Sequence, residues 1–391
     1  MYHYSERLSW NFSPNPISRD LAKRRGHNQP LIDLTSSNPT QVFADYPNAA
    51  IAAAFTRIDS FVYEPHASGA PSARVAVSRY YAERGIQVDP EWIVLTASTS
   101  EAYALLFKLF CNPGDEILVP APSYPLFEFL ARLESVRVKN YHLRFDGSWY
   151  IDIDHLRSRI TQSTRAIVLV NPNNPTGSFL KLSELELLAQ IASEREIPII
   201  CDEVFMDFGF VSQSDVVESL IRRNEVLSFS LNGLSKSAGM PQMKLSWIVI
   251  NGPESQRATA RERLELIADT YLSVATPVQK ALSRLFEIGG SIRHSIQQRI
   301  AHNLSTLRNT LPSSAAQPLA CEGGWSVIVR LPATRTEESW SLRLLNERGV
   351  VVQPGYFFDM PSEPHVVLSL ITPPEEFAHG IAQIHHLCAT E

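Results

Sequence analysis

Residues 165–177 read RAIVLVNPNNPTG, an apolar, β-branched run that ends in a polar loop. Residues 197–203 (IPIICDE) and 226–236 (VLSFSLNGLSK) follow the same plan, each a short run that ends in polar or ionisable side chains. The first two runs do not alternate apolar with polar residues, which is typical of strands covered by helices on both faces. Together they predict a mainly parallel sheet with polar groups at its strand ends.

Seven such runs between residues 92 and 250 are separated by helical patterns, including Ser100–Phe110 and Leu182–Ser193. This order predicts an α/β fold with a seven-stranded, mainly parallel sheet. The predicted strands are Trp92–Ala97, Glu116–Pro120, Val136–His142, Arg165–Asn171, Ile197–Asp202, Val226–Leu231 and Leu245–Ile250.

The pattern changes after about residue 253, where a long helical stretch begins. We expect helices over Pro277–Ile288 and Ile292–Leu311, with a break between them at Gly289-Gly290. Three more strand patterns follow, and they predict a smaller C-terminal α+β domain. These strands are Trp325–Leu331, Val350–Gln353 and Val366–Ile371.

The composition and charge of the chain argue against several classes of function. The chain has 391 residues and a formal net charge of −6, which argues against nucleic-acid binding because that requires a basic face. Residues 1–30 are polar, and no apolar stretch approaches the ~20 residues needed to span a bilayer. We therefore expect no membrane association and a cytoplasmic location. The four cysteines are scattered without metal-ligand spacing, which favours a reducing compartment and predicts no metal site.

Three of the predicted strands end in residues that could carry chemistry: the loop 171–177, Asp202-Glu203, and Lys236 after Asn232. A polar turn, a paired structural acid and a surface lysine could each explain one of these features. Open α/β sheets bind ligands at the carboxyl ends of their strands, so the three together indicate a binding site.

These segments, in the order NPNNPTG, CDEVF and GLSKSAGMPQMKLSW, resemble the class I/II aminotransferases, which are fold-type I enzymes that depend on pyridoxal 5′-phosphate (PLP). Asn174 and Asp202 are 28 positions apart, and Asp202 and Lys236 are 34 apart, which is similar to the family's spacing. The likeness runs from about Leu34 to the C-terminus. It implies a large PLP-binding domain over residues 46–284 and a small domain built from residues 1–45 and 285–391.

The resemblance also implies roles for individual residues. Lys236 is similar to the lysine that forms a Schiff base with PLP and then moves the proton, a role that a lowered pKa favours. Asp202 corresponds to the acid that pairs with the pyridine nitrogen and keeps the ring electron-poor. Asn174 corresponds to the donor to the phenolic oxygen. Tyr124 corresponds to the aromatic residue that stacks on the ring, although the residue alone could equally be a core tyrosine.

The phosphate end of the cofactor is expected at Ser98-Thr99-Ser100, where the start of a helix offers amides and hydroxyls. Taken alone, this triplet would simply be a good helix cap. Lys244 stands where the family often has an arginine against the phosphate. Tyr63 resembles a tyrosine that reaches the phosphate of the neighbouring subunit, so the resemblance implies a homodimer.

The sequence departs from the family at three positions. Phe205 replaces a tyrosine that helps Asn174 hold the phenolic oxygen. Gly233 replaces a serine that contacts the phosphate, a contact that could be lost or move to Ser235. Val367 stands where the family has the arginine that binds the substrate α-carboxylate, and residues 349–391 contain no Lys or Arg. Charge-assisted hydrogen bonds of this kind contribute ~1.5–3 kcal/mol each.

We therefore predict an aminotransferase that takes an amino group from a small-molecule donor and passes it to an oxo acid. The missing arginine indicates an amine or a modified amino acid as donor, unless a basic residue of the N-terminal segment substitutes. Elimination, decarboxylation or oxidation on the same cofactor remain open. A sensor role is disfavoured because about 30 residues before Leu34 are too few for a DNA-binding domain. Ala121-Pro122 and Asn174-Pro175 are candidate cis bonds. The candidate substitute cations are Arg19, Lys23, Arg24 and Arg25.

Overall fold

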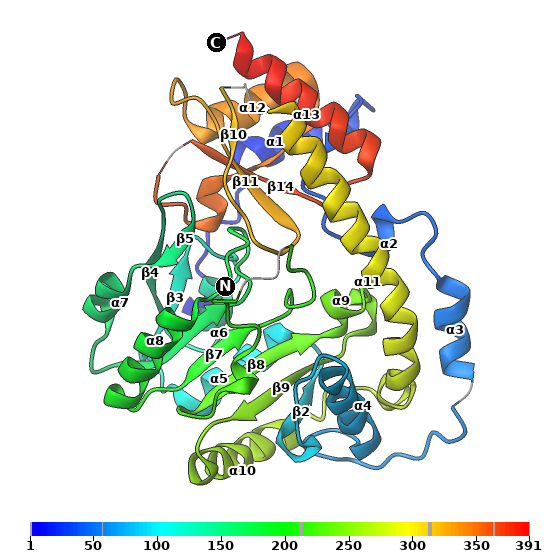
Figure 1. Cartoon of the computed structure of the whole chain (residues 1–391), viewed down its shortest axis with the longest axis vertical. Helices are drawn as coiled ribbons and strands as arrows, with labels where there is room; N and C mark the ends of the chain where they lie inside the picture. Colours follow the sequence, from blue (N-terminus) through cyan, green and yellow to red (C-terminus); the bar gives the residue numbers. More distant parts are fainter. Residues whose placement is uncertain (1, 57, 211–213, 312–314, 363, 391) are drawn as a thin grey trace.

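The computed structural model describes residues 2–56, 58–210, 214–311, 315–362 and 364–390. A large eight-stranded sheet lies in the lower half of the molecule as drawn in Figure 1, and a smaller sheet lies above it. The central strands are parallel, and strand β9 runs antiparallel to both of its neighbours. In spatial order the strands are β2 (Ile93–Thr96), β9 (Ser246–Asn251), β8 (Ser228–Gly233), β7 (Ile199–Asp202), β6 (Thr164–Val170), β3 (Glu116–Ala121), β4 (Arg137–Phe145) and β5 (Trp149–Ile151).

Helices cover both faces of the large sheet, which explains its apolar strands. In β6, Ala166 and Val168 point to the core beneath helices α5 (Thr99–Phe110) and α10 (Glu254–Tyr271). Ile167 and Leu169 point to the opposite core. There they meet helices α7 (Ile153–Arg159) and α8 (Leu182–Arg195).

The predicted α/β fold is confirmed, but the strand count of seven is wrong. The eighth strand, β5, has three residues and pairs antiparallel with β4 at the edge of the sheet. A strand this short has too few residues to show a pattern.

The upper sheet has four strands and packs with helices α12 (Glu337–Arg348) and α13 (Pro374–Ala389). The N-terminal part of the chain joins it: β1 (Ile32–Asp33) pairs in parallel with β12 (Val350–Val351), and α1 (Pro16–Gly26) packs on α12. These contacts agree with a small domain made from both chain ends, whose boundaries stay a prediction. The sheet strands are β10 (Gln317–Pro318), β11 (Ser326–Arg330), β14 (His365–Ser369) and β13 (Gln353–Pro354).

The two helices predicted around Gly289-Gly290 are one continuous helix, α11, from Thr276 to Thr310. The expected break is therefore wrong. Gly289 is buried against Ala238, and a Cβ at this position would lie 2.5 Å from the Ala238 Cβ. The glycine thus permits close approach of another segment instead of ending the helix.

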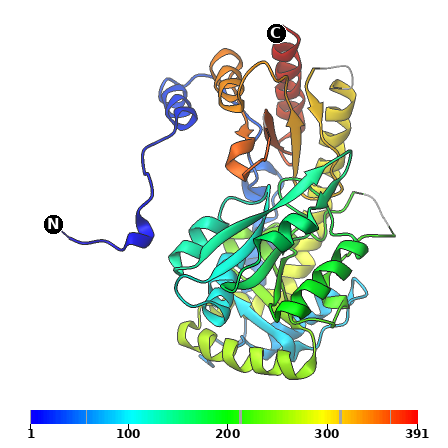
Figure 2. The same cartoon turned by 90° about the vertical axis from the view of Figure 1, so that its left-hand side faces the viewer.

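Several shorter helices complete the chain: α2 (Pro39–Val42), α3 (Asn48–Thr56), α4 (Pro71–Ala82), α6 (Phe127–Leu133) and α9 (Leu234–Ser237). Figure 2 shows the N-terminal segment standing out to one side of the body. It touches α6, where the Trp10 and Phe129 ring centroids are 4.9 Å apart. No helix in the described part of the chain is long and apolar enough to cross a membrane.

Candidate active site

A cavity of about 390 Å³ opens at the carboxyl ends of the parallel strands, between the large sheet and the upper sheet. Tyr63 lies elsewhere, 69% exposed, in a separate hollow that also contains Tyr271. The structure brings the other ten predicted site residues to the walls of the cavity: Ser98, Thr99, Ser100, Tyr124, Asn174, Asp202, Phe205, Ser235, Lys236 and Lys244.

Lys236 lies in the single turn of helix α9, directly after strand β8. Its Nζ is 4.4 Å from the centre of the Trp325 ring and 5.5 Å from that of Phe205. Burial lowers the pKa of Lys236 to about 8, although the charge of Asp202 opposes the change. A significant fraction of this amine is therefore uncharged and nucleophilic near neutral pH.

Asp202 is the last residue of β7, beside β8 in the sheet. Its Oδ2 accepts a hydrogen bond from the Tyr103 hydroxyl at 3.3 Å, and its Oδ1 accepts one from the Val204 amide at 3.2 Å. Burial raises the pKa of Asp202 to about 6, partly offset by these hydrogen bonds and by Lys236. Above that pH the carboxylate is charged and can pair with a cationic ring nitrogen.

Asn174 belongs to the loop that follows β6. Asn174 lines the cavity, and its Oδ1 is buried without a hydrogen-bond partner among the described residues; the group that could donate to a ligand is Nδ2. The loop is held by its own contacts, such as the Thr176 hydroxyl donating to Asn173 Oδ1 at 2.9 Å. The predicted cis bonds at Ala121-Pro122 and Asn174-Pro175 are confirmed, and the structure adds a third at Asn171-Pro172.

The Ser98-Thr99-Ser100 triplet marks the beginning of α5. Ser98 is the cap residue, and its hydroxyl accepts from the Glu101 amide at 3.1 Å. The amides of Thr99 and Ser100 are in the first helical turn, where N–H groups have no partner within the helix. With the helix dipole, these amides could hold an anion in the cavity.

The glycine at 233 is explained by a neighbouring strand. Gly233 pairs in register with Ser246, and a Cβ at Gly233 would collide with the Ser246 hydroxyl. A serine at 233 would therefore not fit. Ser246 itself lines the cavity, and its hydroxyl lies beside Gly233, where the missing serine would stand; Ser235 also lines the cavity. Lys244 adds a positive charge to the same cavity.

The opposite wall, contributed by the upper sheet and the chain before α2, is neutral. Among the described residues that line the cavity, the cations are Lys236 and Lys244. Val367 is 1% exposed and pairs with Ile328 in the core behind this wall. The N-terminal cations Arg19, Lys23, Arg24 and Arg25 lie in α1 and are not among the described residues that line the cavity; Arg24 donates instead to the Asn346 carbonyl at 3.1 Å. The polar residues of this wall are Thr35, Ser37, Ser326, Gln353 and Ser369.

The cavity residues that the sequence reasoning did not predict include Tyr103, Trp325 and Ser246. Tyr103 could have been found, since it is one helical turn after Thr99 and so lies on the same face of α5. Trp325 begins a predicted strand whose place relative to Lys236 depends on how the two sheets pack. The position of Ser246 beside Gly233 could not be predicted without the register of β8 against β9.

These features suit the parts of PLP. An amine of lowered pKa could take the aldehyde, a carboxylate could face the ring nitrogen, an unpartnered amide could meet the phenolic oxygen, and a helix start beside a lysine could hold the phosphate. At the strand ends of an α/β sheet, they define a fold-type I PLP-dependent enzyme. The model of the family "Aminotransferase class I and II" matches residues 29–384. The chain belongs to this family, and the family depends on PLP.

Individual relatives agree with this assignment. Glutamate–pyruvate aminotransferase AlaA of Escherichia coli is 29% identical to this chain over 268 residues. The match covers 68% of this chain and 66% of that enzyme, which is slightly less than two thirds of its length. Human tyrosine aminotransferase is 27% identical over 397 residues, covering 98% of this chain and 87% of that enzyme. Among solved structures, an alanine aminotransferase from Pyrococcus furiosus matches with a TM-score of 0.87 and 24% identity over the full length of both chains. This likeness concerns the fold.

Proposed function

We propose that the protein is a PLP-dependent aminotransferase whose amino donor is an amine, or an amino acid modified at its carboxylate, and whose acceptor is an oxo acid. Bound here, PLP supplies an electron-poor ring that takes up the electron pair released when a Cα–H bond breaks. The protein holds the cofactor, orients the donor and moves the proton.

Lys236 is the residue we propose for proton transfer. Its pKa of about 8 lies close to a neutral working pH, where a general base is most effective. Asp202, with a pKa of about 6, is charged under the same conditions and holds a proton on the ring nitrogen. Tyr103 keeps the carboxylate oriented through its hydrogen bond to Oδ2. Tyr124 offers its ring as one wall of the cavity.

We propose that the phosphate lies at the start of α5, against Lys244. The amides of Thr99 and Ser100 bind it through hydrogen bonds, and Lys244 contributes a point charge. Ser246 supplies a hydroxyl in place of the serine that Gly233 excludes. Phe205 does not donate to the phenolic oxygen, so Asn174 serves that atom alone. Phe205 packs on Trp325 instead, with ring centroids 5.5 Å apart.

The proposed class of amino donor rests on one observation, the neutral wall that faces Lys236. A substrate carboxylate placed against Ser326, Gln353 and Ser369 would exchange its hydration for neutral donors alone, which is unfavourable without a cation. Hydroxyls and a carboxamide suit an uncharged polar group, such as a hydroxyl or an amide. An amine or an amino acid derivative fits this wall better than an ordinary α-amino acid.

Matched donor pairs test this proposal. The protein is loaded with PLP, and the decay of its visible absorbance is followed with alanine against ethylamine and with tyrosine against tyramine. We expect faster decay with the amine of each pair, together with conversion of the cofactor to its amine form. Alanine or tyrosine reacting as well as its amine would overturn the proposed substrate class. Ammonia release without the amine form of the cofactor would indicate the lyase alternative.

We further propose a cytoplasmic homodimer in which Tyr63 reaches the neighbouring active site. Tyr63 is exposed together with Phe61 and Val62, each at least 62% accessible, as expected of a surface that another subunit covers. Sedimentation of the PLP-loaded protein tests this assembly. A monomer at micromolar concentration would contradict it.

A further inference from the structure

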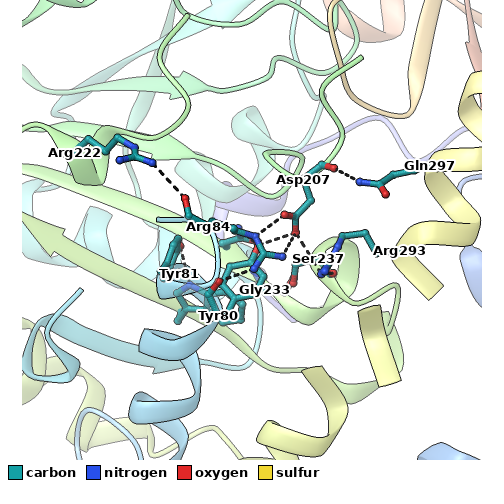
Figure 3. Close-up of polar contacts among 11 residues, drawn as sticks. Tyr80, Tyr81, Arg84, Asp207, Arg222, Gly233, Ser237, Arg293 and Gln297 are labelled. Atoms are coloured by element: carbon teal, nitrogen blue, oxygen red, sulfur yellow. Dashed lines mark hydrogen bonds and ion pairs between the residues drawn. The ribbon is translucent and has the colours of Figure 1, made fainter. Parts of the chain in front are cut away.

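A cluster of charged side chains lies behind the turn that carries Lys236. The Asp207 carboxylate, with its side chain 9% exposed, lies between two guanidinium groups (Figure 3). Arg84 donates to it through Nε at 2.6 Å and Nη2 at 3.2 Å, and Arg293 Nη1 is 3.8 Å away. The Tyr80 hydroxyl adds a hydrogen bond at 2.8 Å. Burial and the Asp207 charge raise the pKa of Tyr80, so this hydroxyl stays protonated and donates.

The cluster joins the two loops on which the proposed chemistry depends. Asp207 is five residues after Asp202, in the loop that leaves β7. Arg293 Nη1 also donates to the Ser237 carbonyl at 3.0 Å, and Ser237 follows Lys236 directly. The Ser237 hydroxyl in turn donates to the Gly233 carbonyl at 2.8 Å, at the beginning of the same turn. Arg293 therefore connects the end of the lysine turn to the Asp207 loop.

Helix α11 packs closely against this turn. Gly289 allows close approach to Ala238, and Arg293 is one helical turn later on the same face. A four-residue helix such as α9 leaves carbonyls without partners inside the helix. Arg293 satisfies one of them from outside.

We propose that Arg293 is a positioning residue that fixes the turn carrying Lys236, with Asp207 holding its guanidinium in place. This inference rests on the proposed function of Lys236. The effect is geometric, because the charged group that acts on the pKa of Lys236 is Asp202. Misplacing a reacting group by about 1 Å costs about 100-fold in rate, so a loosened turn lowers both capture of PLP and proton transfer.

The test compares Arg293→Met with Arg299→Met, a matched control six residues later on α11. Arg299 is also a partly buried arginine that donates to backbone carbonyls, those of Val42 at 3.4 Å and Ile371 at 3.3 Å. Each variant is incubated with PLP and borohydride, and the fraction of chain labelled at Lys236 is measured by peptide mass spectrometry. Melting temperatures and the pH midpoint of labelling are measured in parallel.

We expect Arg293→Met to lower the rate of labelling and the kcat about 10- to 100-fold, with the pH midpoint of labelling unchanged. Arg293→Lys, which keeps one donor and the charge, should restore part of the loss. Arg299→Met should lower the melting temperature without changing the labelling. Equal losses in both methionine variants, or wild-type labelling in Arg293→Met, would overturn the positioning role. A wild-type protein with no labelled Lys236 would overturn the proposed function and this inference with it.

Discussion

The two walls of the cavity differ in how they are built. The wall formed by the large sheet carries Asn174, Asp202 and Lys236, which follow or end three adjacent strands. The opposite wall presents Ser326, Gln353 and Ser369, with no arginine among its described residues. The cofactor side thus carries the residue types expected from the family, whereas no arginine lies among the described residues of the opposite wall. We infer from this difference that the groups proposed for the chemistry and the groups proposed for substrate choice lie on separate parts of the fold.

Replacing Lys236 tests the large-sheet wall most severely. In Lys236→Ala we expect turnover to fall by about 10⁴-fold, because the group proposed to move the proton is gone. PLP should still bind through the anion site, without a borohydride-stable link. Stopped-flow absorbance and mass spectrometry measure the two properties. A variant that keeps more than a tenth of the wild-type rate would contradict the assignment of Lys236.

Asp202→Asn, on the same wall, is expected to change catalytic activity and the free energy of unfolding in opposite directions. We expect a loss of about 100-fold or more in kcat, as when one preorganised charge is removed from an active site. The pKa of Asp202 is raised from 3.8 to about 6, so the folded state binds more protons than the unfolded state between these values. Stability therefore falls as the pH rises through this window, and the cost of burying the charge is complete above it.

At pH 7.5 the Asp202→Asn apoprotein should consequently be more stable than wild type, by about 1–3 kcal/mol. Urea unfolding of the two apoproteins at pH 7.5 and pH 4 measures this difference, which should shrink at the lower pH. An equal or larger gain at pH 4 would show that charge burial is not its cause.

Val367→Arg tests whether the missing arginine determines which amino donors the opposite wall accepts. Val367 shares a face of β14 with Ser369, which lines the cavity, so a longer side chain can extend toward it. We expect kcat/KM for α-amino acids, relative to the matched amines, to rise at least about tenfold, as one charge-assisted hydrogen bond allows. Val367→Met, which adds length without charge, is the control. A folded arginine variant with unchanged preference would show that the neutral wall alone does not set the substrate class.

The pH dependence of PLP capture sharpens the account of Lys236. Only the uncharged amine reacts, and with a pKa of about 8 its fraction rises with pH. The rate at which the apoprotein captures PLP should increase about fivefold between pH 7 and pH 8. Stopped-flow absorbance across pH 6 to 10 gives the midpoint. A midpoint near the ordinary lysine value of 10.5 would mean that burial does not lower this pKa.

The smallest effect is expected at Ser246. Its hydroxyl is one of several groups proposed for the phosphate, so Ser246→Ala should weaken PLP binding about threefold, the worth of a weak hydrogen bond. Equilibrium dialysis of PLP measures the change. An unchanged affinity would remove Ser246 from the site, and Gly233→Ser is expected to be more harmful because its side chain collides with Ser246.

Much of the fold could be predicted because the strands are long, apolar and bounded by turns. The misses have local causes. Strand β5 is too short to show a pattern, and Gly289 looks like a helix break until the Ala238 backbone is seen against it. Trp325 was predicted to begin a strand, but it lies just before β11, and the position of its ring near Lys236 depends on the packing of the two sheets.

The sequence by itself determined the order of strands and helices, the three strand-end motifs and the absence of an arginine near the C-terminus, because these are properties of spacing and residue type. The tertiary structure decided which side chains share the cavity, how far burial moves the pKa values of Lys236 and Asp202, and which residue fills the space beside Gly233. It also placed Arg293 and Asp207 behind the lysine turn. Such features depend on the register and packing of segments far apart in the chain, and burial, which sets the pKa values, exists only once those segments have met.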